Sequence, residues 1–403
     1  MPACGADRFY VRRLISVRAS SITMLSAAAL PRPVWRSPIN RRQIPGLVLT
    51  ILLMPMLATP AAAATPQVST QAANSQPKPN DAVVHDFVFG DGENLALLKL
   101  HYLTLGKPRR DASGAITNGV LLLHGTAGSS ADLVTPGFFD ALYGAGEPLD
   151  LSRYFLVIPD VIGAGDSSKP SDGLRAHFPH YGYKDQVRAQ HQMLEQIGIK
   201  HVKVVLGTSM GGMQTWLWGE MFPNDMDCLV AIATTPAAIS GRNMVWREMV
   251  SQAIRGDPAW QNGNYPKNSP PRNWINVAVP LSAIMTGSAG QLQDQGPTRA
   301  TAISLVDNME TKGEAYDAND MLYDFESSVD YDPAPNLHLI DKPILTINFA
   351  DDLTNPPQFL HMPTASNYTS VLIPAAPDSY GHMNIAHPAV WASALQSFLQ
   401  RLP

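Results

Sequence analysis

The chain has 403 residues, of which 16% are charged, and its formal net charge at pH 7 is −5. This charged fraction lies below the ~25% of average soluble proteins, and no block of lysine or arginine follows residue 64, which argues against nucleic acid as a partner. Cys4 and Cys228 are the only cysteines, and Cys4 belongs to a segment that we expect to be removed, so no disulfide is expected. Cys228 is predicted to be a small buried hydrophobic residue.

The first 64 residues predict a signal peptide. They are basic and then apolar, with Arg41-Arg42 before an apolar core at residues 46–58 and small residues for cleavage near Ala64. This pattern predicts a periplasmic or secreted protein. The core is shorter than the roughly 20 apolar residues of a membrane helix, so we expect no stable membrane anchor, with an uncleaved anchor as the alternative. Met24 is an alternative start of translation.

Residues 65–80 are rich in Thr, Gln, Ala, Pro and Ser, which predicts a flexible linker. Two strand-like runs at 83–89 and 95–104 flank a Gly-Asp-Gly turn and predict a hairpin. Short apolar runs at 119–123, 155–158, 202–206 and 229–233 predict buried strands, and residues 184–197 predict a helix that Gly198 ends. Strands that alternate with helices indicate a mostly parallel sheet covered on both faces, with residues 81–236 as its first part.

The alternation stops after Pro236. Residues 237–335 contain amphipathic helical stretches such as 244–254 and predict a helical cap inserted into the core. Strands are expected again at 344–349 and 369–373, followed by a helix at 389–402, so that residues 336–403 complete the core. The apolar residues of the cap suggest a substrate with an apolar acyl or alcohol part, or they pack the cap itself; they are Trp246, Trp260, Trp274, Ile275, Leu281, Ile284 and Met285.

The most informative motif is Gly207-Thr208-Ser209-Met210-Gly211, a G-x-S-x-G pattern between an expected strand and an expected helix. Glycine is needed two residues before and after the serine, because only a residue without a side chain allows such a close approach of backbones. The turn predicts Ser209 as a catalytic nucleophile.

A serine hydroxyl needs a general base and a group that orients this base, and in this context the chain order is serine, acid, histidine. The acid is expected after the strand at 344–349, where Asp352 is favoured and Asp351 is the alternative. The base is expected after the strand at 369–373, where His382 is favoured over His387.

The oxyanion of an acyl-transfer reaction needs two backbone N–H donors. One is expected from Met210, the residue after the nucleophile. The other is expected from Thr126, in the His124-Gly125-Thr126 segment that follows the strand at 119–123. The sequence has no H-E-x-x-H motif, no paired cysteines and no G-x-x-x-x-G-K-[ST] loop, so neither a metal nor another cofactor is expected.

These residues resemble a known family. The segment 209–214 is similar to the nucleophile segment of homoserine O-acetyltransferases, a branch of the α/β-hydrolase superfamily. Residues 178–179, 185–190, 248–260, 352–357 and 381–382 are also similar to that family, and the resemblance covers roughly residues 85–385. It implies an α/β-hydrolase fold with Ser209, Asp352 and His382 as the triad.

Three departures from the family pattern favour a different acceptor. The family carries an arginine on a cap helix for the homoserine carboxylate, but residues 274–290 contain no Arg or Lys. The family's catalytic histidine is followed by Asp, whereas Met383-Asn384 follow here. His124-Gly125 is more typical of hydrolases.

The sequence therefore predicts an exported serine esterase that acts on a small-molecule ester through an acyl-enzyme. An acyltransferase with a changed acceptor is the first alternative, and a non-catalytic binding module on the same fold is the second. The oligomeric state is left open, with a homodimer as one possibility.

Overall fold

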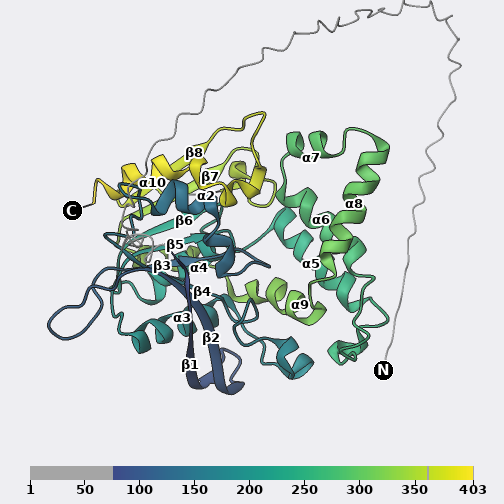
Figure 1. Cartoon of the computed structure of the whole chain (residues 1–403), viewed down its shortest axis with the longest axis horizontal. Helices are drawn as coiled ribbons and strands as arrows, with labels where there is room; N and C mark the ends of the chain where they lie inside the picture. Colours follow the sequence, from purple (N-terminus) through teal and green to yellow (C-terminus); the bar gives the residue numbers. More distant parts are fainter. Residues whose placement is uncertain (1–75, 361–362, 403) are drawn as a thin grey trace, which may run out of the picture. The chain divides into compact units, whose positions relative to one another are not determined.

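An eight-stranded sheet forms the centre of the described part of the chain (Figure 1). The structure is a computed structural model that describes residues 76–360 and 363–402; the predicted signal peptide and most of the predicted linker lie outside these residues. In spatial order the strands are β1 (Lys78–Val88), β2 (Asn94–Gly106), β4 (Phe155–Pro159), β3 (Gly119–Leu123), β5 (Val202–Thr208), β6 (Met226–Ile232), β7 (Ile344–Phe349) and β8 (Tyr368–Ile373).

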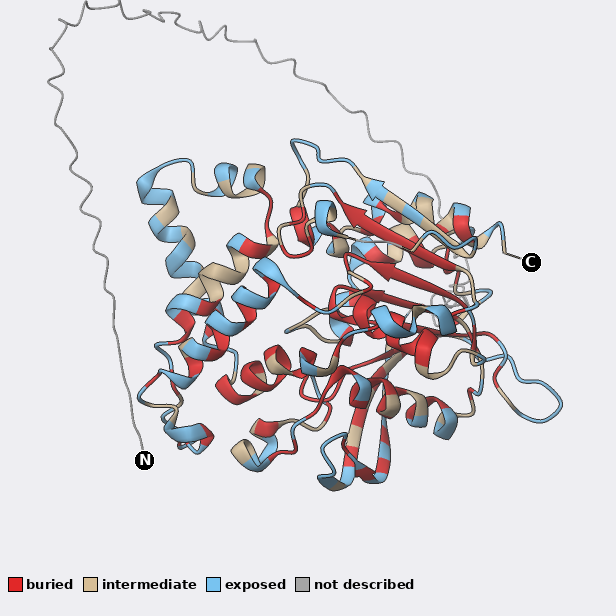
Figure 2. Cartoon of the chain, turned by 180° about the vertical axis from the view of Figure 1, so that it is seen from behind, coloured by how far each residue is buried: buried red, intermediate tan, exposed pale blue. Residues whose placement is uncertain are grey.

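The sheet is mostly parallel, as the sequence predicts. β1 and β2 pair antiparallel, as do β2 and β4, and the remaining neighbours from β4 to β8 pair parallel. Every residue of β3, β4 and β7 is buried, which Figure 2 shows as the red centre of the molecule. Such strands read as continuous apolar runs because helices cover both faces of a parallel sheet. This arrangement is that of an α/β fold.

The hairpin begins earlier than the sequence predicts. β1 starts at Lys78, which pairs with Thr104, and Asn80 pairs with Tyr102, so the end of the predicted 65–80 linker belongs to the sheet. The linker prediction came from composition alone, which does not report the partner strand. Pro79 is tolerated here because β1 is an edge strand and needs no donor on its open side.

The helices of the core flank the sheet; they are α2 (Pro136–Phe138), α3 (Tyr183–Ile197), α4 (Met210–Met221) and α10 (Ala392–Leu399). α3 ends at Gly198, whose φ of 90° is left-handed, as the helix-stop signal predicts. α10 is shorter than the predicted helix at 389–402. The backbone of Trp391 leaves the helical region (φ −126°, ψ −4°) and separates α10 from a 3-10 turn at Pro388–Val390. Trp391, Leu395 and Phe398 are still buried together.

Five α-helices lie between β6 and β7 in the sequence and to one side of the sheet in Figure 1. They are α5 (Gly241–Arg255), α6 (Ile275–Thr286), α7 (Ala289–Gln295), α8 (Arg299–Gly313) and α9 (Ala318–Glu326), and we call them the cap helices. They share a hydrophobic cluster of their own that includes Val250, Ile254 and Trp274. None of the helices in the described residues is both long and apolar enough to span a bilayer.

Candidate active site

Ser209 stands on a strained turn between β5 and α4. Its φ of 53° and ψ of −115° lie outside the regions that a serine normally occupies, and such strain costs about 1–3 kcal/mol. Two hydrogen bonds hold the turn: Ser209 N–H donates to the carbonyl of Ile232 (2.8 Å), and the carbonyl of Ser209 accepts from Met213 N–H (2.9 Å). The strain therefore persists because the sheet and α4 fix both sides of the residue.

The two glycines of the motif are needed for close approach. A Cβ on Gly207 would lie 2.0 Å from the carbonyl oxygen of Gly211, and one on Gly211 would lie 2.3 Å from the carbonyl oxygen of Leu123. Real Cβ contacts are never this short. Larger residues at either position would push α4 away from the sheet and move the Ser209 hydroxyl.

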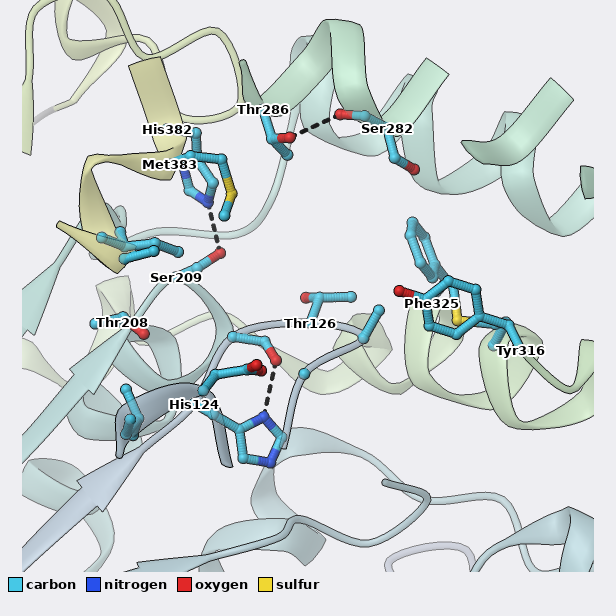
Figure 3. Close-up of a pocket in the computed structure, with 18 of the residues that line it drawn as sticks. His124, Thr126, Thr208, Ser209, Ser282, Thr286, Tyr316, Phe325, His382 and Met383 are labelled. Atoms are coloured by element: carbon cyan, nitrogen blue, oxygen red, sulfur yellow. Dashed lines mark hydrogen bonds between the residues drawn. The ribbon is translucent and has the colours of Figure 1, made fainter. Parts of the chain in front are cut away.

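A chain of hydrogen bonds connects Ser209, His382 and Asp352 (Figure 3 shows the first bond). Oγ of Ser209 lies 2.8 Å from Nε2 of His382, and Nδ1 of His382 lies 2.7 Å from Oδ2 of Asp352. All three residues are buried, with relative exposures of 8%, 3% and 2% respectively. With the proton on Nδ1, the ring donates to Asp352 and its Nε2 accepts from the serine hydroxyl.

The carboxylate of Asp352 is fixed by a turn of its own. Its second oxygen, Oδ1, accepts hydrogen bonds from the backbone N–H groups of Thr354 (2.7 Å) and Asn355 (2.9 Å). The neighbouring Asp351 instead accepts from Gly381 N–H (3.2 Å) and makes no hydrogen bond to the imidazole. Of the two aspartates that the sequence left open, the structure therefore brings Asp352 to His382.

The loop after β8 presents His382 to the serine. Gly381 has a left-handed φ of 62°, and the side chain of Asn384 bonds the carbonyl of Gly381 (2.8 Å) and the amide of Tyr380 (3.3 Å). His387 faces elsewhere, with its ring stacked 3.6 Å from that of Tyr380, and burial lowers the pKa of its imidazole. Asn384 thus holds the histidine loop, which sequence analysis did not foresee.

The segment after β3 forms a tight turn beside Ser209, and we call residues 125–128 the oxyanion loop. His124 Nε2 accepts from Val161 N–H (3.2 Å), so Nδ1 carries the proton and donates to the carbonyl of Gly125 (2.9 Å). Within residues 76–360 and 363–402, the backbone amides of Thr126 and Met210 donate to no protein acceptor. Both predicted donors are therefore free to bind a ligand oxygen.

Ser209 and His382 lie at one side of a cavity of about 410 Å³ between the core and the cap helices (Figure 3). Its wall is mainly apolar and includes Leu133, Phe138, Trp246, Ala278, Val279, Met321, Phe325, Met383 and Ile385, with hydroxyls from Thr126, Ser282, Thr286 and Tyr316. Asp132 contributes a carboxylate, and among the described residues that line the cavity there is no lysine or arginine. The cavity suits an uncharged ligand.

Most of the apolar cap residues that the sequence singled out do not reach the cavity. Trp246 lines it, whereas Trp274 and Ile275 are buried in the cap's own cluster and Ile284 is 55% exposed. Phe325 and Met321 of α9, which do line the cavity, were missed. They carry no local signal, because their place in the wall depends on how α9 packs against the core. In the described part of the chain, no group of three or more His, Cys, Asp or Glu side chains is arranged to hold a metal ion.

Comparison with known proteins places the chain in a family. Residues 118–362 match the family model described as alpha/beta hydrolase fold, and the chain belongs to this family. It falls in the homoserine O-acetyltransferase-like branch, as the sequence predicts. A "Probable acyltransferase" from Methanothermobacter thermautotrophicus is 26% identical over 320 residues, which are 78% of this chain and 96% of that protein. A "Homoserine O-acetyltransferase" from Trichormus variabilis is 29% identical over 73% of this chain and 86% of its own length.

Solved structures agree on the fold. The crystal structure of esterase E22 superimposes with a TM-score of 0.71 at 20% sequence identity and covers 80% of this chain and all of that one. The proteins of similar sequence are thus named as acyltransferases, and this protein of similar fold is named as an esterase.

Proposed function

We propose that this protein is an exported serine esterase that hydrolyses uncharged carboxylic esters through an acyl-enzyme. The observation that carries the proposal is the hydrogen-bonded chain from Ser209 through His382 to Asp352, which ends at the wall of an apolar cavity. A serine, an imidazole and a carboxylate in this order form the arrangement that activates a hydroxyl for attack on an acyl carbon.

In the first half of the reaction, Ser209 Oγ attacks the ester carbonyl while His382 Nε2 takes its proton. Negative charge then develops on the former carbonyl oxygen, and the amides of Met210 and Thr126 stabilise it. The imidazolium is stabilised by Asp352, which stays ionised. The tetrahedral intermediate collapses when the bond to the alcohol oxygen breaks, and His382 gives its proton to the leaving alcohol.

In the second half, water occupies the place that the alcohol has left. His382 Nε2 takes a proton from this water, whose oxygen attacks the acyl carbon of the ester on Ser209. The bond between the acyl carbon and Ser209 Oγ then breaks, and the proton returns to the serine. The products are one carboxylic acid and one alcohol.

The lining of the cavity supports hydrolysis over transfer to homoserine. Homoserine is a zwitterion, and its carboxylate needs a charge-assisted partner in a site with little water. The described lining residues offer no cation for it, and residues 274–290 contain none. The basic and apolar N-terminal segment supports export, and acetyl-coenzyme A is not expected outside the cytoplasm, whereas water is always present as an acceptor.

A fluorophosphonate probe tests the nucleophile directly. The wild-type protein should be labelled, labelling should disappear in Ser209→Ala, and Ser370→Ala, which removes a hydroxyl on β8, should label normally. Failure of the folded wild type to label would favour a binding module in place of an enzyme.

Product partition separates hydrolysis from transfer. With a p-nitrophenyl ester as donor, the esterase should yield free acid at the same rate with or without added homoserine. Formation of the homoserine ester, or of an ester of another added alcohol in excess of the acid, would instead identify an acyltransferase. A series of p-nitrophenyl esters from acetate to palmitate would give the acyl length.

A further inference from the structure

The oxyanion loop is held from the cap side by two buried charged residues. Asp324 of α9 accepts a hydrogen bond from Ala127 N–H at 2.6 Å, and Arg247 of α5 donates through Nη2 to Thr126 Oγ1 at 3.3 Å. Asp324 is 3% exposed and Arg247 is 4% exposed. Neither lines the cavity beside Ser209, so neither would contact a ligand there directly.

Among the described residues, the carboxylate of Asp324 has a single hydrogen-bond donor. Its Oδ2 accepts from Ala127 N–H, and its Oδ1 has no partner among the described residues. Burial raises the pKa of this carboxyl, while the Ala127 amide and the nearby charge of Arg247 act in the opposite direction. Burial of a carboxylate that accepts only one hydrogen bond costs stability. Stability therefore does not account for an acid at this position.

The bond from Ala127 acts at a strained point of the backbone. Ala127 has a left-handed φ of 58°, a conformation that non-glycine residues adopt only when their surroundings impose it. Because Asp324 fixes the N–H of Ala127, it fixes the peptide plane between Thr126 and Ala127. This plane adjoins Thr126, whose own amide is the proposed oxyanion donor.

Arg247 connects the cap with the core at the same loop. Its guanidinium donates to Asn243 Oδ1 (3.0 Å) and to the carbonyl of Phe325 (3.0 Å) on the cap side. It also donates to the hydroxyl of Tyr183 (3.1 Å) and to Thr126 Oγ1 on the core side. The guanidinium is thus anchored on both sides, and Thr126 is held by a rigid donor.

We propose that Asp324 and Arg247 are positioning residues that hold the oxyanion loop in the geometry in which the Thr126 amide binds the developing negative charge. The inference rests on the proposed esterase function. It predicts that loss of either residue lowers kcat and leaves KM nearly unchanged. The Thr126 amide binds the ester oxygen most strongly in the transition state, when negative charge develops on that oxygen.

The test compares three variants at two aspartates of α9. Asp324→Leu should lower kcat for a p-nitrophenyl ester by about 10²-fold, near the effect of losing one oxyanion donor, with KM within about 3-fold. Asp324→Asn should recover most of the activity, because its amide oxygen still accepts from Ala127 N–H. Asp320→Asn is the matched control: Asp320 is a half-buried acid on α9 that accepts hydrogen bonds from the backbone N–H and the hydroxyl of Ser171 (2.8 and 2.6 Å), so the kcat of this variant should stay within about 3-fold of wild type.

Amide hydrogen exchange at Ala127 gives a readout that does not depend on turnover. Exchange should become faster in Asp324→Leu, and it should stay slow in Asp324→Asn and Asp320→Asn. Arg247→Met should also lower kcat by at least tenfold. Unchanged exchange together with unchanged kcat in Asp324→Leu would overturn the inference. If the wild type proves inactive, the esterase proposal fails, and exchange at Ala127 alone then decides whether Asp324 holds the loop.

Discussion

Replacement of Asp352 by asparagine should impair the enzyme through the tautomer of His382. Oδ1 of Asp352 is already bonded by two backbone N–H groups, from Thr354 and Asn355. An asparagine must direct its carbonyl oxygen to these two donors, which leaves its NH₂ group facing Nδ1 of His382. Nδ1 then has to accept a hydrogen bond, so the ring proton moves to Nε2 and faces Ser209, and the base cannot take the serine proton.

The expected loss in kcat is about 10⁴-fold, which corresponds to about 5.5 kcal/mol of transition-state stabilisation. KM should change little, because the asparagine has the same volume and the cavity wall is untouched. The assay is steady-state hydrolysis of a p-nitrophenyl ester, with thermal unfolding to verify that the variant folds. Asp351→Asn is the matched control and should lose less than about tenfold, since its amide oxygen can still accept from Gly381 N–H. A kcat for Asp352→Asn within tenfold of wild type, or an equal loss in Asp351→Asn, would refute the reasoning.

Three other predictions concern stability, the cavity and the thiol. Burial raises the pKa of Glu220 from 4.5 to about 7, so the native state binds this proton more tightly than the unfolded state does. Between pH 5 and pH 8 the free energy of unfolding of the wild type should therefore fall by up to about 3 kcal/mol more than that of Glu220→Gln. Urea unfolding at the two pH values measures this difference, and equal pH profiles of the two proteins would contradict the prediction. Ser282→Leu adds volume to the cavity wall and should shift the p-nitrophenyl series towards shorter acyl chains, whereas Ile284→Phe, on the exposed side of the same helix, should leave the preference unchanged. Cys228 is fully buried and burial raises the pKa of its thiol to about 12, so a disulfide reagent should react with it only after unfolding, and rapid reaction of the native protein would show that β6 is accessible.

The sequence predicted what is local or ordered along the chain. The strand–turn–helix around Ser209 is encoded within a few residues. The sharp turn leaves no room for a side chain at Gly207 or Gly211, and this requirement follows from the motif alone. Asp352 and His382 could be proposed because each follows a strand that ends at the same edge of a parallel sheet. The mostly parallel sheet was predicted from the alternation of short apolar strands with helices along the chain.

The sequence could not predict contacts that depend on packing between distant segments. Ala127 and Asp324 are 197 residues apart, and no sequence pattern near either residue predicts their hydrogen bond. The cavity wall is also assembled from several separate segments, so its residues carry no common spacing. The first residues of β1 were missed for the same reason: they pair with β2, although their composition is typical of a linker.

The point at which the cap helices enter the fold has an evolutionary consequence. The chain leaves the sheet at the end of β6 and returns on β7, the adjacent strand, where Leu229 pairs with Ile344 and Ile232 with Ile347. Everything between these strands can be lengthened, shortened or exchanged without a change in strand register. Evolution can thus change the cap, and with it the acceptor, while Ser209, Asp352 and His382 stay in place on the sheet, provided that the new cap still supports the oxyanion loop.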